Sequence, residues 1–202
     1  MKPIIFKTDE VRAILEGRKS QTRRVAKYIT DYCISDERIN AHIKTKTKNS
    51  YFTGCIKHFN EMYAPYQVDD VLWVRETWQL LPSGFDEIPP EKNYIYKATD
   101  ELSDECTRWR RSIHMPREAA RLFLKVTGVR VERVQNMNFY DWKADFCPSF
   151  NEQEKALASF TGHTYVVELM KNLWDGIYST KGYSWDTNPW VFVIEFERVK
   201  NP

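Results

Sequence analysis

Cysteine is scarce in this chain, glycine is not abundant, and no apolar run is long enough for a membrane span. The four cysteines lie far apart without a C-x-x-C pair, at positions 33, 55, 106 and 147. A disulfide framework typically belongs to short secreted chains, so we expect none here. Cys55 and His58 have a C-x-x-H spacing, but a structural zinc site needs four ligands. We therefore expect no metal and no other cofactor.

The chain also lacks targeting and nucleotide-fold motifs. The apolar start at residues 3–6 ends at Lys7, too early for a signal peptide, and the later run 189–194 has only strand length. We expect a soluble cytoplasmic protein without a membrane partner. No segment resembles a Walker loop, a dinucleotide fingerprint or a Ser-His-Asp set.

Aromatic residues and local charge are what the sequence does have. Seven Trp, eleven Tyr and eleven Phe can form the core of one domain, because each large ring buries about 150–250 Å². Residues 1–50 carry 12 Lys and Arg against 6 Asp and Glu, a net of +6, although the whole chain has a net charge of only +2. This asymmetry indicates a local anionic partner or, equally, a solvated basic face.

The apolar spacing predicts an α+β fold. Strand patterns occur at 3–6, 20–25, 71–74, 94–96, 121–134 and 189–196, with a hairpin around 49–56. Helical patterns occur at 9–16, 137–145 and 152–176, the first with Thr8 as N-cap and Gly17 as its stop. Gly128 interrupts its strand and predicts a bulge or bend. We expect one domain, residues 1–202, with a mostly antiparallel, closed or nearly closed sheet and insertions near 29–62 and 80–105.

The strongest candidate site is a basic segment between the first helix and the next strand. Its cations are Arg18, Lys19, Arg23 and Arg24. Strand alternation predicts that Ser20, Thr22 and Arg24 share one face, which suits a phosphate or carboxylate. Basic surface turns are common, so the segment alone does not establish a site.

A second cluster follows the strand at 71–74. Arg75, Glu76 and Trp78 could contact a nucleobase, Trp78 by stacking and Glu76 by accepting a hydrogen bond from an amine. A rim salt bridge beside a core tryptophan is the alternative. We expect residues 17–24 to line the main cleft together with Glu76 and Trp78.

Two further segments carry candidate ligand contacts. His114 and Arg117 flank Pro116, which we expect near the start of a helix whose N-terminus could receive an anion. A structural His114 is the alternative. Trp185 and Asn188 belong to a polar turn before the last strand; we expect Trp185 to stack on unpaired bases and Trp190 to pack in the core.

Several ordered blocks resemble one family. The segment 14–24, ILEGRKSQTRR, is similar to the G-x-K-x-x-T-x-R signature of ASCH domains, and segments 65–78, 111–121 and 182–190 resemble blocks of phage and prophage members. The resemblance runs from residue 3 to about 197. It implies a PUA-like β-barrel with flanking helices, a phage-type origin, and binding of RNA or nucleotides.

A branch of that family hydrolyses N4-acetylcytidine with a Lys, a Thr and a Glu. By resemblance Lys19 and Thr22 match the first two, and Asp145 is the nearest equivalent of the acid. Such a reaction could use Thr22 as nucleophile, Lys19 as the group that takes its proton, and Asp145 to protonate the departing amine. Lys19 and Thr22 can converge only if residues 19–20 lie in the turn, because side chains three apart on a strand face opposite ways.

The sequence leaves three hypotheses. The leading one is a protein that binds RNA, single-stranded nucleic acid or a nucleotide in a barrel cleft. The second is an amidohydrolase or nuclease that acts on modified nucleosides or RNA. The third is an interaction protein that blocks a host factor.

Overall fold

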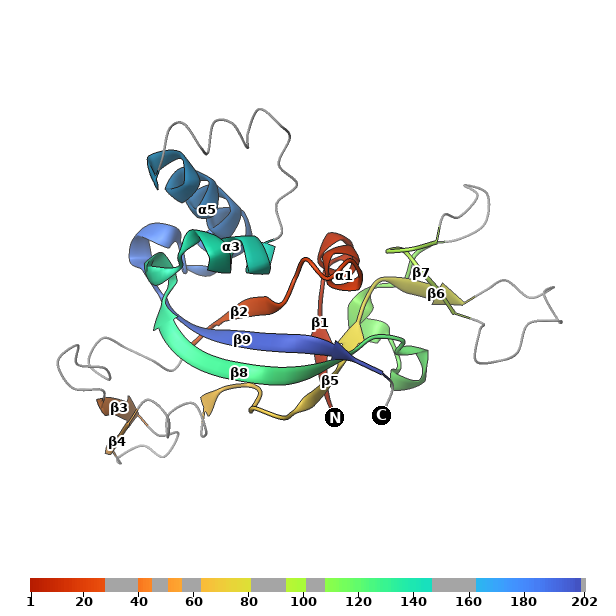
Figure 1. The fold of residues 1–202 in the computed structure, drawn as a ribbon, viewed down its shortest axis with the longest axis horizontal. Helices are drawn as coiled ribbons and strands as arrows, with labels where there is room; N and C mark the ends of the chain where they lie inside the picture. Colours follow the sequence, from red (N-terminus) through yellow and green to blue (C-terminus); the bar gives the residue numbers. More distant parts are fainter. Residues whose placement is uncertain are drawn as a thin grey trace, which may run out of the picture. The chain divides into compact units, whose positions relative to one another are not determined.

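The structure, a computed structural model, describes residues 1–27, 40–44, 51–55, 63–80, 94–100, 108–146 and 163–200 (Figure 1). Within 40–44, 51–55 and 163–166, and at position 139, it describes the backbone alone. The residue contacts form two compact units. Unit 1 holds residues 1–20, 69–126 and 196–202, and unit 2 holds residues 21–68 and 127–195.

The main sheet has five strands in the order β1-β5-β8-β9-β2. These strands are β1 (Lys2–Ile5), β2 (Gln21–Val25), β5 (Val71–Arg75), β8 (Phe123–Arg133) and β9 (Trp190–Val199). Strand β1 is parallel to β5, whereas β5 pairs antiparallel with β8 and β2 with β9. The expectation that the first and last strands share a sheet is confirmed. In the described part of the chain the hydrogen bonding leaves β1 and β2 as sheet edges, and no closed barrel forms.

Unit 1 begins with β1 and helix α1 (Thr8–Leu15). The sequence suggested Thr8 as the N-cap, but the N-cap is Lys7. The Glu10 carboxylate reaches back and accepts a hydrogen bond from the Lys7 N–H at 2.8 Å. The helix ends at Leu15 with Glu16 as C-cap, and Gly17 follows as the predicted stop with a φ of +74°. The Arg18 and Lys19 N–H groups then donate to the Ala13 carbonyl at 2.8 and 3.1 Å. This closure sets the direction in which the chain enters β2.

A small second sheet completes unit 1. Strand β6 (Trp78–Leu80) pairs antiparallel with β7 (Tyr94–Tyr96), and Trp78 packs with Met115 and Ala119. The prediction of an α-helix after Pro116 is wrong, because only a three-residue 3-10 helix, η4 (Arg117–Ala119), follows it. A single 3-10 turn aligns too few peptide dipoles to attract an anion, and another, η3 (Ser112–His114), precedes it.

Unit 2 is built on β2 and β9 and covered by helices α3 (Phe139–Phe146) and α5 (His163–Tyr178). Its core contains Trp142, Trp174 and Trp185, all buried. Strand β4 (Tyr51–Cys55) pairs antiparallel with β3 (Asn40–Lys44), so the range 49–56, where the sequence predicted a whole hairpin, holds only one of its two strands. The remainder of the insertion near 29–62, most of that near 80–105, and the start of the 152–176 helix lie outside the described residues.

Gly128 lies inside β8, which Figure 1 shows as one continuous, curved strand. A Cβ at this position would lie 2.6 Å from the Glu195 Oε2 atom. A side chain here would displace the Glu195 carboxylate, so glycine allows a close approach that the sequence pattern did not reveal.

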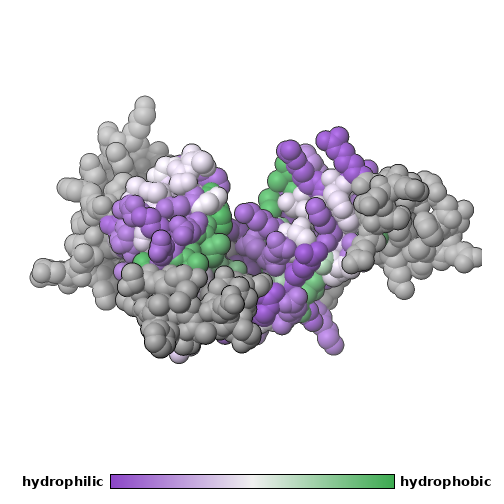
Figure 2. Space-filling view, turned by 90° about the horizontal axis from the view of Figure 1, so that it is seen from above, coloured by the Kyte–Doolittle hydropathy of each residue, from purple (hydrophilic) through white to green (hydrophobic). Residues whose placement is uncertain are grey.

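Hydrophilic residues cover more of the described surface than hydrophobic ones in the view of Figure 2. None of the helices in the described ranges combines the length and the apolar composition that crossing a bilayer requires.

Candidate functional site

Strand β2 separates the predicted basic cluster onto two faces. Arg23 and Gln21 share one face, and the Gln21 amide donates to the Asp141 carbonyl at 2.5 Å and to its carboxylate at 3.2 Å. Thr22 and Arg24 share the other face, and Thr22 is 1% exposed opposite Ile194 of β9. The alternation expected from the sequence is thus present, and the two arginines have different surroundings.

Arg23 is buried among carboxylates. Its guanidinium donates to Glu132 at 2.7 Å and to Asp145 at 3.1 Å, and Asp141 lies 3.7 Å away. These acids already neutralise the cation, so Arg23 serves to hold α3 on the sheet, and its assignment to a nucleic-acid phosphate is corrected.

Arg130, which is partly exposed, extends this network toward the surface. It binds Glu132 and Asp141 at 3.1 Å each, and also Glu195. Burial would lower the pKa of Arg130, but the hydrogen bond to Glu132 and the charges of Asp141 and Glu195 outweigh it and raise the pKa. Despite its carboxylates, this part of the described chain contains no group of His, Cys, Asp and Glu side chains that could hold a metal ion.

The three residues matched to a hydrolase do not belong to one unit. Lys19 lies in the loop before β2, as its convergence with Thr22 would require. Its Nζ is 3.5 Å from the Glu10 Oε1 atom and 5.7 Å from the Phe6 ring centre. Lys19 is in unit 1, whereas Thr22 and Asp145 are in unit 2. Asp145 binds Arg23. The hydrolase assignment stays a prediction.

The second predicted cluster lies in unit 1 and has structural partners. Glu76 is 1% exposed and accepts two hydrogen bonds from Arg121, each 2.9 Å long. Arg75 donates to the carbonyls of Met115 and Ile113. Trp78 is a core residue at 3% exposed, so it offers no open ring face to a base, and its stacking assignment is corrected. A cleft shared by Thr22, Glu76 and Trp78 stays a prediction, because Thr22 belongs to the other unit.

Trp185 and Asn188 are also structural. Trp185 is 6% exposed inside the core of unit 2, and its backbone N–H binds the Asp175 carboxylate at 2.6 Å. Asn188 adopts the left-handed conformation and accepts from the Gln135 N–H. The sequence predicted Trp190 as the core residue and Trp185 as the exposed one, whereas Trp190 is only half-buried, with Arg133 4.3 Å from its ring centre. The ring of Trp185 therefore has no free face for stacking.

Three predicted residues remain exposed. Arg18 pairs with Glu16 at 2.6 Å, Arg117 approaches Met1, and His114 ends the 3-10 helix η3. All three belong to unit 1, and none lines the pocket described next.

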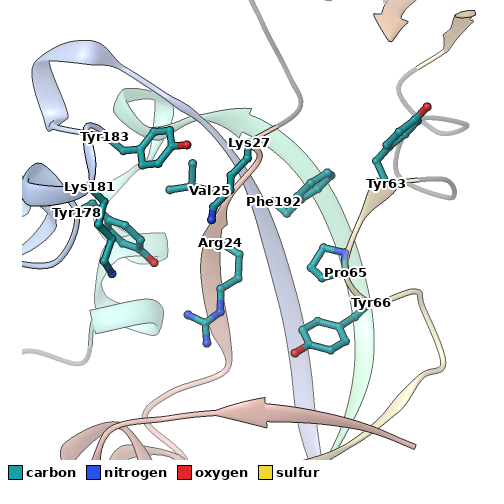
Figure 3. A pocket seen from close by; sticks show the side chains of 10 residues that line it. All are labelled: Arg24, Val25, Lys27, Tyr63, Pro65, Tyr66, Tyr178, Lys181, Tyr183 and Phe192. Atoms are coloured by element: carbon teal, nitrogen blue, oxygen red, sulfur yellow. The ribbon is translucent and has the colours of Figure 1, made fainter. Parts of the chain in front are cut away.

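Unit 2 contains an open pocket with a volume of about 700 Å³ (Figure 3). Three segments and one residue of β9 line it. Its described lining residues are Arg24, Val25, Lys27, Tyr63, Pro65, Tyr66, Tyr178, Lys181, Tyr183 and Phe192. We call it the basic–tyrosine pocket, because three of these residues are cations, four are tyrosines and none is acidic.

Arg24 is fixed at the centre of this pocket. Its Nη1 donates to the Arg23 carbonyl at 3.3 Å, and the Tyr178 hydroxyl donates to the same oxygen at 3.3 Å. Tyr178 is itself held by stacking on Trp174, with ring centres 4.2 Å apart, and Lys181 lies 5.1 Å from its ring centre. The guanidinium of Arg24 and the phenol of Tyr178 are thus pre-oriented by one backbone group.

Of the residues that the sequence singled out, Arg24 alone is among the described residues that line this pocket. Sequence reasoning missed Lys27, Lys181 and the four tyrosines. Two local signals could have found them: the pairs Tyr63/Tyr66 and Tyr178/Tyr183 flank short loop segments, and Lys27 lies three positions after Arg24. Comparison with protein families, with curated proteins and with solved structures found no match.

Proposed function

We propose that this chain binds a nucleotide or an unpaired stretch of nucleic acid in the basic–tyrosine pocket. The observation that carries the proposal is the combination of Arg24, Lys27 and Lys181 with four tyrosines and no described acidic lining residue. A pocket lined by several cations attracts an anion, and tyrosine rings suit the faces of a nucleobase.

The size of the pocket supports a small ligand or a single unpaired nucleotide. A volume of about 700 Å³ lies in the range that small-molecule sites occupy. The basic N-terminal quarter of the sequence supports an anionic partner as well, since Arg24 and Lys27 belong to it.

The segment 14–24 supports the finer proposal that the fold is that of an ASCH domain of the PUA-like type. Its signature ends on Arg24, the residue at the centre of the pocket. Under this proposal the described five-stranded sheet corresponds to the barrel wall, and the ligand class that the resemblance implies agrees with the chemistry of the pocket.

An equilibrium binding experiment tests the function. AMP, ATP and a short single-stranded RNA are titrated against the wild-type chain and against Arg24→Ala and Lys181→Ala. Each variant should lose about 10- to 150-fold in affinity, because a hydrogen bond to a charged group contributes about 1.5–3 kcal/mol.

Lys143→Ala is the matched control, since Lys143 is an exposed cation of α3 that does not line the pocket. It changes the net charge by the same amount as Lys181→Ala and should leave the affinity unchanged. Absence of binding to all three probes, or an equal loss in the control, would refute the proposal.

A further inference from the structure

We infer that the ligand of the basic–tyrosine pocket is a free nucleoside di- or triphosphate, with its phosphates at Arg24, Lys27 and Lys181 and its base against Tyr63, Tyr66 and Phe192. This inference rests on the proposed function and narrows it to one substrate class. It is carried by the arrangement of charge within the pocket.

The cations gather on one part of the lining. Arg24 and Lys27 come from β2 and the turn after it, and Lys181 comes from the 3-10 helix η6 (Ser179–Lys181) that follows α5. In Figure 3 the nitrogen atoms of all three lie toward the Tyr178 side of the pocket. The opposite side is formed by Tyr63, Pro65, Tyr66 and Phe192, which carry no charge. The pocket is therefore polarised into a cationic wall and an aromatic wall.

The number of cations favours more than one phosphate group. Three positive charges in one pocket exceed the charge of a single phosphodiester, and no described lining residue is acidic. A di- or triphosphate carries several adjacent negative charges on a short chain and can contact all three cations at once. Successive phosphates of a strand are separated by sugars, so a strand would bring fewer of its charges into a pocket of about 700 Å³.

The tyrosines have different tasks in this arrangement. Tyr178 stacks on Trp174 and lies near Lys181, so its contribution is the hydroxyl on the cationic wall. Tyr66 and Phe192 supply rings on the other wall, where a base can lie against them.

A probe series tests the inference on the wild-type chain. Adenosine, AMP, ADP, ATP, inorganic tripolyphosphate and a short oligoadenylate are titrated under identical salt. Affinity should rise about tenfold from AMP to ADP or ATP, because added phosphate oxygens form charge-assisted hydrogen bonds. Tripolyphosphate should bind about tenfold more weakly than ATP, because it has no base to stack.

Variants at exposed or half-buried positions separate the two walls. Lys27→Ala and Lys181→Ala replace exposed side chains and should reduce the preference for ATP over AMP, whereas Lys143→Ala should not. Tyr66→Leu should weaken ATP about tenfold and leave tripolyphosphate unchanged, and Tyr66→Phe, which keeps the ring, should retain ATP affinity. The unchanged tripolyphosphate binding shows that the variant is folded.

The outcomes distinguish this inference from the function on which it rests. Oligoadenylate binding that is tighter than ATP and falls steeply with salt would overturn the inference and leave nucleic-acid binding standing. Equal affinities for AMP and ATP would overturn the assignment of a polyphosphate. Equal affinities for tripolyphosphate and ATP would overturn the role of the aromatic wall in binding the base. No binding by any probe would overturn the inference together with the proposed function.

Discussion

Arg23 and Arg24 are neighbours on β2, yet they lie in opposite electrostatic surroundings. Arg23 is buried and bound by Glu132 and Asp145, with Asp141 close by. Arg24 faces a pocket whose described lining contains two more cations and no acid. The difference shows that neighbouring cations on one strand can have opposite surroundings, because alternate side chains of a strand project to opposite faces. The predictions below test this contrast between an acid-rich region and an acid-free one.

The largest effect should come from Arg23→Met. Removing this guanidinium breaks the ion pair with Asp145, which is 4% exposed, and leaves Glu132 with Arg130 as its cation. Breaking such a buried pair typically costs about 3–5 kcal/mol. The free energy of unfolding, measured by denaturant titration, should fall by this amount.

Arg24→Met is the matched comparison one position along the strand. Because Arg24 is only half-buried and its described hydrogen bond is to a backbone carbonyl, its loss should cost less than about 1 kcal/mol of stability and act mainly on binding. Equal losses of stability in the two variants would contradict the contrast.

A smaller effect is expected at Trp185, which the sequence proposed as a base-stacking residue. Trp185→Leu should destabilise unit 2 by about 2–3 kcal/mol, because leucine fills only part of the volume that the indole occupies in the core. Nucleotide affinity measured well below the unfolding transition should not change. A tenfold loss of affinity in a variant of normal stability would restore Trp185 as a ligand contact.

The secondary structure was largely predictable from the sequence, because it follows from local patterns. Alternation predicted β2 and the faces of Thr22 and Arg24, and Gly17 marked the end of α1. The buried run at 71–74 became β5. Each of these depends on neighbours within a few residues.

The candidate site was much less predictable, because it depends on which distant residues meet. Arg23 and Arg24 look alike in sequence, and the acids that separate their roles lie more than a hundred positions away, at Glu132 and Asp145. The tyrosines of the pocket come from two segments more than a hundred positions apart, 63–66 and 178–183. The burial of Trp185 and Trp190 was predicted the wrong way round for the same reason, because burial here depends on packing against α5.

A weaker effect is expected from Gly128→Ala, at the edge of the acid-rich network. The new methyl group would lie 2.6 Å from the Glu195 Oε2 atom and push that carboxylate away from Arg130. Both side chains are partly exposed, so losing the pair should cost about 1 kcal/mol at most. In a Glu195→Gln background, Gly128→Ala should lower the free energy of unfolding by less than it does in the wild type. Equal losses in the two backgrounds would exclude the contact with Glu195 as the cause.

The smallest effect concerns Tyr96 in unit 1, where another arginine is paired with a buried carboxylate. Arg121 binds Glu76 and lies 3.9 Å from the Tyr96 ring centre. Burial raises the pKa of Tyr96 from 10.0 to about 12, and the charge of Arg121 opposes this rise. A raised pKa means that folding favours the neutral phenol, so this contribution to stability is complete below pH 10 and is lost as the pH rises toward 12. The tyrosinate absorbance of the wild type minus that of Tyr96→Phe should show a midpoint near 12, and Arg121→Gln should shift the midpoint upward. A midpoint near 10, or a downward shift in Arg121→Gln, would contradict the assignment.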